Sequence, residues 1–252
     1  MMKRQSTRTM RLLIPMVALL AFAACGKLQD DSGKTDVGTE QPVPVPEPAP
    51  GSDTVELWVD LGLPSGRLWA SCNVGASRPE EFGGYFAWGE VAVKEYYDFS
   101  TYCLCRGDYT SLVKYCNNAA YGYDGYTDTL TVLQPEDDIA ALVYGEGARI
   151  PTLQDWQELH TGTSITLTNR GGVRGYLFTG SNGNSIFLPF SGLRYEDWQH
   201  GNTGQMAYYW SGSLYQEAAH SAWAFYMPTC DKGLLTEENR SVGITVRAVR
   251  SG

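Results

Sequence analysis

Residues 149–159 read Arg-Ile-Pro-Thr-Leu-Gln-Asp-Trp-Gln-Glu-Leu and predict the second of two helices in this chain. Thr152 stands where a helix needs its N-cap, and Asp155 three residues later completes a short form of the capping box. The apolar residues that follow share one face of the helix, and they are Leu153, Trp156 and Leu159. This pattern predicts an amphipathic helix that packs on a core.

A first helix is predicted just upstream, over 135–143. Pro135 is favoured in the first turn of a helix, and the carboxylates of Glu136, Asp137 and Asp138 suit its positive end. Gly145 then ends the helix.

Strand-like runs lie on both sides of the helices. They are 55–59, 68–74, 85–88, 164–168, 173–179, 185–189, 206–213, 221–227 and 244–249. Apolar and polar residues alternate in the last run, and turn residues bound the others. Two early helices followed by a series of strands predict an α+β domain, in which the helices pack on mainly antiparallel strands.

The first 24 residues have the composition of a secretory signal peptide. Basic residues without acidic ones precede an apolar run, Leu12 to Ala24, that is too short for a bilayer core, which takes ~20 helical residues. Cys25 follows Ala24 directly, as in a bacterial lipobox, although Phe22 stands where Leu is more usual. We expect Cys25 to be lipidated. The alternatives are ordinary secretion with cleavage near Ala24 and a cytosolic N-terminus that merely has an apolar composition.

Net charge excludes one class of partner. The chain carries −9 overall, and removal of residues 1–24 leaves 15 basic against 28 acidic residues, a net charge of −13. Nucleic-acid binding requires a basic surface, so no nucleic-acid partner is expected. For the same reason we expect the lipid, and not basic residues, to hold the chain to a membrane.

Residues 25–52 predict a lipid anchor and a tether. Alternating prolines at 41–50 favour an extended polyproline II spacer of ~3 Å per residue. The run 27–31 resembles the acidic export signals that send lipoproteins to the outer surface of Bacteroides-like bacteria. The predicted location is therefore the outer membrane, facing the exterior. Residues 53–252 contain no second proline-rich break and are predicted to form one domain.

Several motifs along this domain occur in a familiar order. They are 59–75 (VDLGLPSGRLWASCNVG), 84–90 (GYFAWGE), 149–159, 182–189 (NGNSIFLP), 208–213 (YYWSGS) and 243–249 (GITVRAV). Together they resemble the Fibrobacter succinogenes major paralogous domain, common in lipoproteins of Bacteroides-like bacteria. The resemblance implies a C-type-lectin-like fold, related in architecture to formylglycine-generating enzymes and to phage receptor-binding proteins. It implies little about chemistry, because a fold does not determine a function.

The motifs of common enzymes are missing. His160, His200 and His220 lie in no nucleophile motif, and the chain has no His-Glu-x-x-His or Gly-x-Ser-x-Gly. Formylglycine-type oxidases use a cysteine pair near the C-terminal end, where this chain has only Cys230. We therefore expect no enzyme and no cofactor. Five acidic residues could offer oxygens to calcium, but they fit no EF-hand loop, and no metal site is predicted: Asp124, Asp128, Glu136, Asp137 and Asp138.

Five cysteines follow the lipidation site, so at least one is unpaired if pairing is internal: Cys72, Cys103, Cys105, Cys116 and Cys230. Cys116 follows Cys105 across a predicted hairpin. An oxidising compartment would permit a Cys105–Cys116 disulfide, which is our preferred hypothesis. Metal binding by Cys103, Cys105 and Cys116 is the alternative, but a fourth ligand is missing.

The segment 194–204 is predicted to be a polar loop between strands and to form a ligand-binding surface. Its candidate residues are Tyr195, Glu196, Asp197, Trp198 and Asn202. Aromatic rings offer a flat face to a sugar or peptide, and carboxylates and amides accept its hydrogen bonds. A surface loop whose Trp folds back onto the domain is the alternative. Tyr121, Tyr123 and Tyr126 form a second, weaker candidate.

These observations favour a surface-exposed lipoprotein that binds a glycan or a protein without catalysis. A structural or assembly subunit, for example a fimbria-associated one, is the alternative. An enzyme of the formylglycine-generating type is the third hypothesis, and the missing cysteine pair argues against it.

Overall fold

The computed structural model describes residues 57–230 and 232–252. The predicted signal peptide at 1–24, the lipidation site Cys25 and the whole tether up to residue 52 lie outside them. The boundaries predicted for these segments therefore stay predictions.

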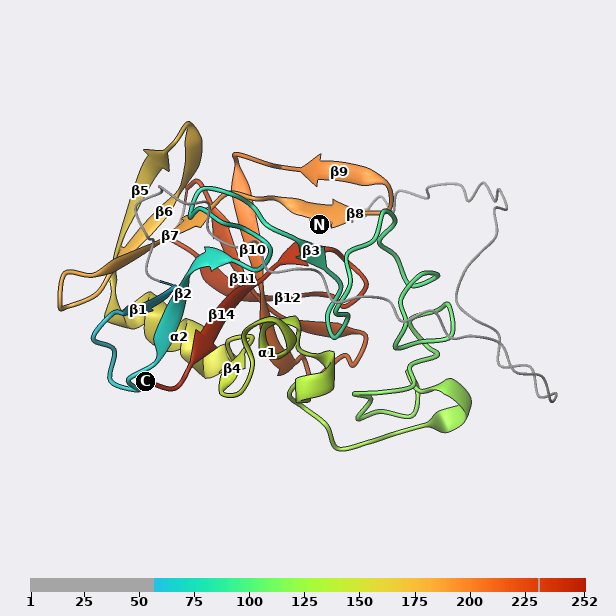
Figure 1. Cartoon of the computed structure of the whole chain (residues 1–252). Coiled ribbons are helices and arrows are strands. Elements are labelled where there is room, and N and C mark those ends of the chain that lie inside the picture. Colours follow the sequence, from blue (N-terminus) through green and yellow to red (C-terminus); the bar gives the residue numbers. More distant parts are fainter. Residues whose placement is uncertain (1–56, 231) are drawn as a thin grey trace, which may run out of the picture. The chain divides into compact units, whose positions relative to one another are not determined.

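The described chain is mainly β, with two short α-helices and three sheets beside a separate hairpin (Figure 1). The first sheet has the order β1 (Trp58–Asp60), β2 (Leu68–Asn73), β14 (Arg247–Arg250), β4 (Ala148–Arg149). The second has the order β12 (Leu234–Asn239), β11 (Ser221–Pro228), β10 (Met206–Leu214), β13 (Ile244–Thr245), β3 (Tyr85–Phe86). The third contains β5 (Ser164–Arg170), β6 (Val173–Thr179) and β7 (Ser185–Pro189). The hairpin consists of β8 (Leu193–Tyr195) and β9 (Trp198–Gly201).

Helix α2 (Leu153–Gly162) begins as the sequence predicts. The Thr152 hydroxyl accepts a hydrogen bond from the Asp155 backbone N–H at 3.3 Å, and the Asp155 carboxylate accepts one from the Thr152 N–H at 2.7 Å. This confirms the capping box. Trp156 and Leu159 are fully buried on its inner face.

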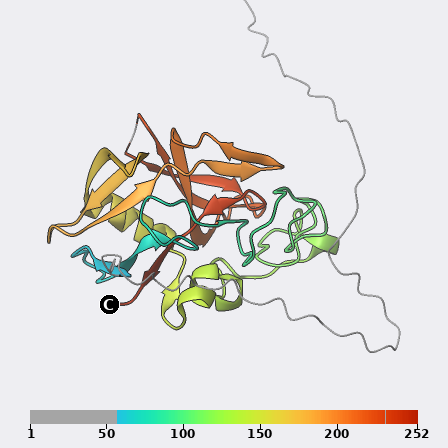
Figure 2. The same cartoon turned by 45° about the horizontal axis from the view of Figure 1, so that its top comes forward.

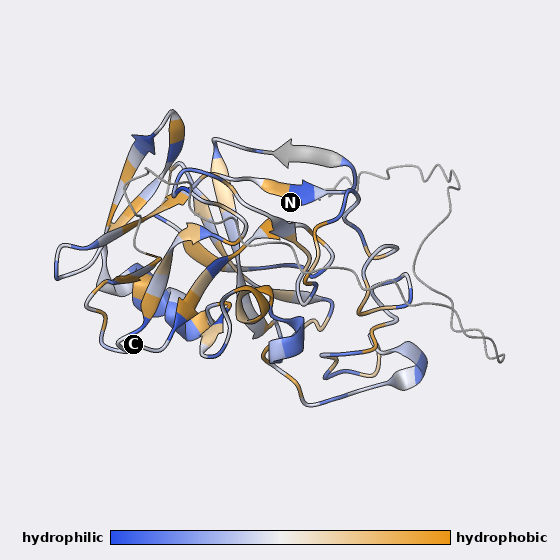
Figure 3. Ribbon diagram, in the orientation of Figure 1, coloured by the Kyte–Doolittle hydropathy of each residue, from blue (hydrophilic) through white to orange (hydrophobic). Residues whose placement is uncertain are grey.

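The first helix is shorter than predicted. Residues Pro135–Asp137 form a 3-10 turn, and α1 spans only Ile139–Tyr144. Asp138 is the reason, because its carboxylate caps the helix by accepting from the N–H groups of Ala140 and Ala141. Helix α1 is hydrophobic along most of its length (Figure 3). No helix in the described part of the chain is long and apolar enough to cross a membrane.

The C-terminal strand predicted at 244–249 is in fact two strands in two sheets. β13 pairs with β10 and β3, whereas β14 pairs with β2 and β4. Val246 lies between them, and its carbonyl accepts a hydrogen bond from the Val74 N–H at 2.9 Å. The chain end thereby joins the first sheet to the second.

A buried arginine joins the first sheet to the third. Arg247 is fully buried, and its guanidinium donates to the Asn73 side chain at 3.0 Å and to the Ala70 carbonyl at 2.9 Å, both on β2. It also donates to the Phe187 carbonyl of β7 at 2.8 Å. Each of the three guanidinium nitrogens thereby donates to an acceptor, as a buried charge requires.

Candidate functional site

The segment 194–204, predicted to be a polar loop, is for the most part a β-hairpin. Tyr195 of β8 pairs with Trp198 of β9, so Glu196 and Asp197 alone form the turn. The loop prediction is wrong, because backbone hydrogen bonds to β9 and to Gly243 hold β8 in an extended conformation. Arg194 exchanges backbone hydrogen bonds of 2.8 and 2.9 Å with Gly243. The hairpin therefore extends as an ordered element from the second sheet, where β8 lies beside β13 (Figures 1 and 2).

The tip of this hairpin is held against a segment far away in the sequence. The Glu196 N–H donates to the Tyr97 carbonyl at 2.8 Å, and the Tyr97 N–H donates to the Glu196 carbonyl at 3.1 Å. Tyr97 itself is fully buried, and its hydroxyl donates to the Tyr85 carbonyl at 2.6 Å. These hydrogen bonds thereby bring Tyr96 and Asp98, the neighbours of Tyr97 in the chain, beside the turn formed by Glu196 and Asp197.

Two exposed tyrosines and three carboxylates meet at this place, and we call them the hairpin-tip surface: Tyr96, Asp98, Tyr195, Glu196 and Asp197. Tyr96 is 40% exposed and Tyr195 is 47% exposed. Desolvation, followed by the negative charges of Glu196, Asp98 and Asp197, raises the pKa of the Tyr96 hydroxyl. Desolvation and the charges of Glu196 and Asp98 raise the pKa of Tyr195 in the same way. Both tyrosines therefore remain neutral hydrogen-bond donors at physiological pH.

The carboxylates of the hairpin-tip surface have no cationic partner among the described residues. None of Asp98, Glu196 and Asp197 forms an ion pair. The nearest basic residues along the chain are engaged elsewhere. Lys94 pairs with Glu90 at 2.8 Å, and the Arg194 guanidinium lies 4.5 Å from the centre of the Tyr85 ring. One oxygen of Asp98 already accepts from the Ser100 hydroxyl at 2.7 Å and from the Thr101 N–H at 3.1 Å, and Glu196 accepts from the Tyr195 hydroxyl. The surface can therefore offer a ligand Asp197 and the remaining carboxylate oxygens as hydrogen-bond acceptors.

The remaining predicted residues are placed differently. Asn202 follows β9 at the base of the hairpin, about 13 Å of strand from Trp198, and its carbonyl accepts from the Gln205 and Met206 N–H groups. The structure therefore separates Asn202 from the tip, and its role in ligand binding stays a prediction. Trp198 begins β9, but its side chain lies outside the described part of the chain.

Sequence reasoning missed Tyr96 and Asp98. A signal was present, because Glu95-Tyr-Tyr-Asp98 repeats the mixture of aromatic and acidic residues found in Tyr195-Glu-Asp-Trp198. Only the bridge between Tyr97 and Glu196 shows that the two runs form one surface.

The second aromatic candidate is a less open surface. Tyr123 is 49% exposed, but the Arg106 guanidinium covers its ring at 4.8 Å. The Tyr126 hydroxyl donates to Asp128 at 2.9 Å, and the Tyr121 ring packs 4.9 Å from the His220 ring. These side chains already have partners within the protein.

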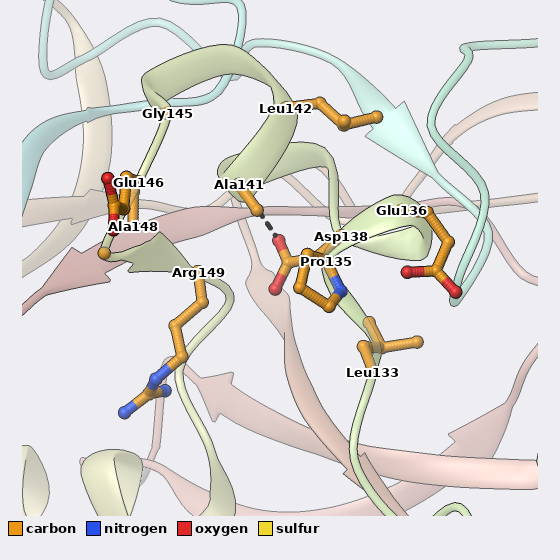
Figure 4. A pocket seen from close by; sticks show the side chains of 11 residues that line it. Leu133, Pro135, Glu136, Asp138, Ala141, Leu142, Gly145, Glu146, Ala148 and Arg149 are labelled. Carbon is orange, nitrogen blue, oxygen red and sulfur yellow. Dashed lines mark hydrogen bonds between the residues drawn. The ribbon is translucent and has the colours of Figure 1, made fainter.

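A pocket of about 670 Å³ lies beside α1, and its polar groups are also engaged (Figure 4). The Asp138 carboxylate caps α1 and accepts from the Ile150 N–H at 2.8 Å. Arg149 pairs with Asp155 at 2.6 Å, and Glu136 pairs with Lys114 at 2.9 Å. Apart from Glu146, the charged groups of the lining are thus satisfied internally, and the pocket offers a ligand a mainly apolar surface.

The predicted Cys105–Cys116 disulfide is not formed in the structure. Both residues are free thiols: Cys105 donates to the Phe99 carbonyl at 3.1 Å, and Cys116 donates to the Asn118 carbonyl at 3.2 Å. The local pairing explains why the predicted disulfide is not formed. The residue opposite Cys105 in an antiparallel bridge is Leu112, and Cys116 lies four residues further along the chain.

Four of the five acidic residues considered for calcium have structural partners among the described residues, and the exception is Asp124. Asp128 accepts from the N–H groups of Tyr115 and Cys116 at 2.7 and 3.1 Å. Asp137 binds Lys114 at 2.5 Å. Within residues 57–230 and 232–252, no group of three or more His, Cys, Asp or Glu side chains is arranged to hold a metal ion.

No family model, no curated protein and no solved structure matches this chain. The geometry of the hairpin-tip surface is therefore the basis on which a function can be proposed.

Proposed function

We propose that this chain is a surface-exposed bacterial lipoprotein whose domain binds a ligand, in the first place a neutral glycan, without catalysis. The observation that carries the proposal is the hairpin-tip surface, where the half-exposed rings of Tyr96 and Tyr195 lie beside three carboxylates that form no ion pair with any described residue. Tyrosine rings stack on the apolar face of a sugar ring, and carboxylates accept hydrogen bonds from its hydroxyl groups.

The charge of the surface narrows the ligand class. Asp98, Glu196 and Asp197 would repel a sulfated or carboxylated saccharide, and their desolvation by such a ligand would not be compensated. A neutral saccharide, or a protein segment with hydroxyl and amine donors, suits the same groups. The fixed backbone of the tip lowers the entropy cost of binding.

The setting of the domain is part of the proposal. The lipobox at Cys25 and the proline-rich tether support an outer-membrane anchor with the domain held away from the bilayer. The ordered motifs support membership of the Fibrobacter succinogenes major paralogous domain family and its C-type-lectin-like fold. The two short helices and the mainly antiparallel sheets are compatible with that assignment.

A glycan array probed with the purified chain, beside a pull-down from surface proteins, tests the proposal. The wild-type chain is compared with Tyr195→Ala and with Tyr123→Ala, a matched control at a tyrosine of similar exposure outside the surface. We expect a neutral saccharide signal that Tyr195→Ala loses and Tyr123→Ala keeps.

The same experiment separates the alternatives. A protein partner lost with Tyr195→Ala, with no saccharide signal, would favour the assembly subunit over the glycan-binding module. Ligand signals that Tyr195→Ala leaves unchanged would contradict a binding role for this surface.

A further inference from the structure

Strand β5 is an open edge of the third sheet. It pairs with β6 over all seven residues without a register shift, and the sheet order β5-β6-β7 leaves its other side unpaired among the described residues. Figures 1 and 2 show β5 at the outer border of the described domain.

The turn after β5 shows which backbone groups face outward. Gly171 and Gly172 connect β5 to β6 as a two-residue loop, and both have positive φ, 57° and 86°, as a type I′ turn requires. The flanking pair Arg170–Val173 is then hydrogen-bonded, and alternate pairs along the hairpin follow the same pattern. The N–H and C=O groups of Ile165, Leu167 and Asn169 therefore point away from β6. None of them has a hydrogen bond to another described residue.

The strand lacks the features that usually protect an edge. Its sequence, Ser-Ile-Thr-Leu-Thr-Asn-Arg, has no proline, no bulge and a single charge at its end. Other edges differ. β12 carries Glu237 and Glu238, and the Phe187 carbonyl on β7 is already bound by Arg247.

We propose that two copies of this chain associate through β5, antiparallel and centred on Leu167. In this register Leu167 faces Leu167 of the second copy, and Ile165 and Asn169 face each other across the axis. All three outward residues of each strand then find partners, which gives six backbone hydrogen bonds. The two three-stranded sheets become one six-stranded sheet.

The side chains are complementary in the same register. Leu167, which is 44% exposed, gains an apolar neighbour. Thr166 lies opposite Thr168 of the second copy, a favourable cross-strand pair. Arg170, the only charge on the strand, lies opposite Ser164, so no like charges meet. A two-fold axis makes such a contact self-limiting, because the interface is closed in the dimer.

The proposal is separate from ligand binding at the hairpin tip, and sedimentation of the full chain in a non-ionic detergent tests it. A single strand pair is a small interface, so we expect a reversible dimer that appears between about 10 µM and about 1 mM. Leu167→Lys places two ammonium groups across the axis and should weaken the dimer at least about tenfold. Leu234→Lys, at a leucine 42% exposed on the edge strand β12, is the matched control and should leave dimerisation unchanged.

Amide hydrogen exchange of the wild-type chain is a second measurement of dimerisation, and it does not require that any variant folds. The amides of Ile165, Leu167 and Asn169 should exchange more slowly as the chain concentration rises. Those of Thr166 and Thr168, already bonded to β6, should not change. A chain that stays monomeric with unchanged exchange would overturn the proposal. A dimer lost in Leu234→Lys but kept in Leu167→Lys would overturn it as well.

Discussion

Glu196 holds a backbone conformation that residues with side chains seldom adopt, with a φ of 53°. For residues other than glycine this region costs about 1 kcal/mol. The hydrogen bonds exchanged with Tyr97 keep the conformation in place. A glycine would fit the turn better, so stability alone does not account for the carboxylate at this position. The proposed recognition of a ligand would account for it.

Glu196→Gly is therefore expected to separate binding from stability. Because strain is relieved, the free energy of unfolding should not fall, whereas affinity for the ligand should fall about tenfold with the loss of an acceptor. Denaturant unfolding and titration of the ligand measure the two quantities. Asp124→Gly is the control, since Asp124 has a φ of 51° but lies outside the hairpin-tip surface. An unfolding loss without a binding loss in Glu196→Gly would refute this explanation.

Arg247→Lys tests the buried link between the first and third sheets. A lysine cannot supply donors to Asn73, Ala70 and Phe187 together, so acceptors would be left unsatisfied in the core. We expect a loss of about 2–4 kcal/mol in the free energy of unfolding, measured in urea. An unchanged midpoint would show that the guanidinium contacts contribute nothing.

The sequence predicted part of the hairpin-tip surface. Tyr195, Glu196 and Asp197 stood out because aromatic and acidic residues are adjacent in the chain. Tyr96 and Asp98 could not be assigned to the site, because their position depends on a bridge between segments far apart in the sequence. Asn202 was grouped with the tip residues although it lies away from them, since a predicted loop did not reveal the length of β9.

Elements with strong local signals were predicted well. β6 and β7 have the predicted bounds, and α2 begins at the predicted cap. β12, with the sequence Leu-Leu-Thr-Glu-Glu-Asn, was missed because four of its six residues are polar or acidic, a composition typical of a loop. The division at Val246 has no local signal, since it arises from pairing with two different sheets.

The cap of α2 should make stability depend on pH. Burial alone would raise the pKa of Asp155, but hydrogen bonds from Arg149 and Thr152 outweigh it and hold that pKa below its ordinary value of 3.8. The folded state therefore binds this proton less tightly than the unfolded state. The carboxylate contributes stability that is fully present above the ordinary value and is lost as pH falls through the lowered one.

Asp155→Asn checks this expectation. The difference in unfolding free energy between the wild-type chain and the variant should be constant above about pH 5 and should narrow below about pH 4. Unfolding in urea over a pH series measures it. A difference that is the same at every pH would rule out the ionised cap as its source.

At the scale of the whole molecule, β5 and the hairpin tip lie on opposite sides of the described domain (Figure 1). Changes at distant sites without shared partners are additive. Tyr195→Ala should therefore leave dimerisation unchanged, and Leu167→Lys should leave ligand affinity unchanged. Sedimentation and ligand titration on both variants measure this. Cross-effects larger than about twofold would show that the two surfaces are coupled.

The central claim is that Tyr96 and Tyr195, distant in sequence, form one ligand-binding surface. The most direct test is the affinity of the ligand found on the array for five chains: wild type, Tyr96→Ala, Tyr195→Ala, the double variant and the control Tyr123→Ala. We predict that each single variant weakens binding by about tenfold or more, that the double variant departs from additivity, and that the control binds as wild type does. Wild-type affinity in Tyr96→Ala and Tyr195→Ala, or an equal loss in Tyr123→Ala, would contradict the claim.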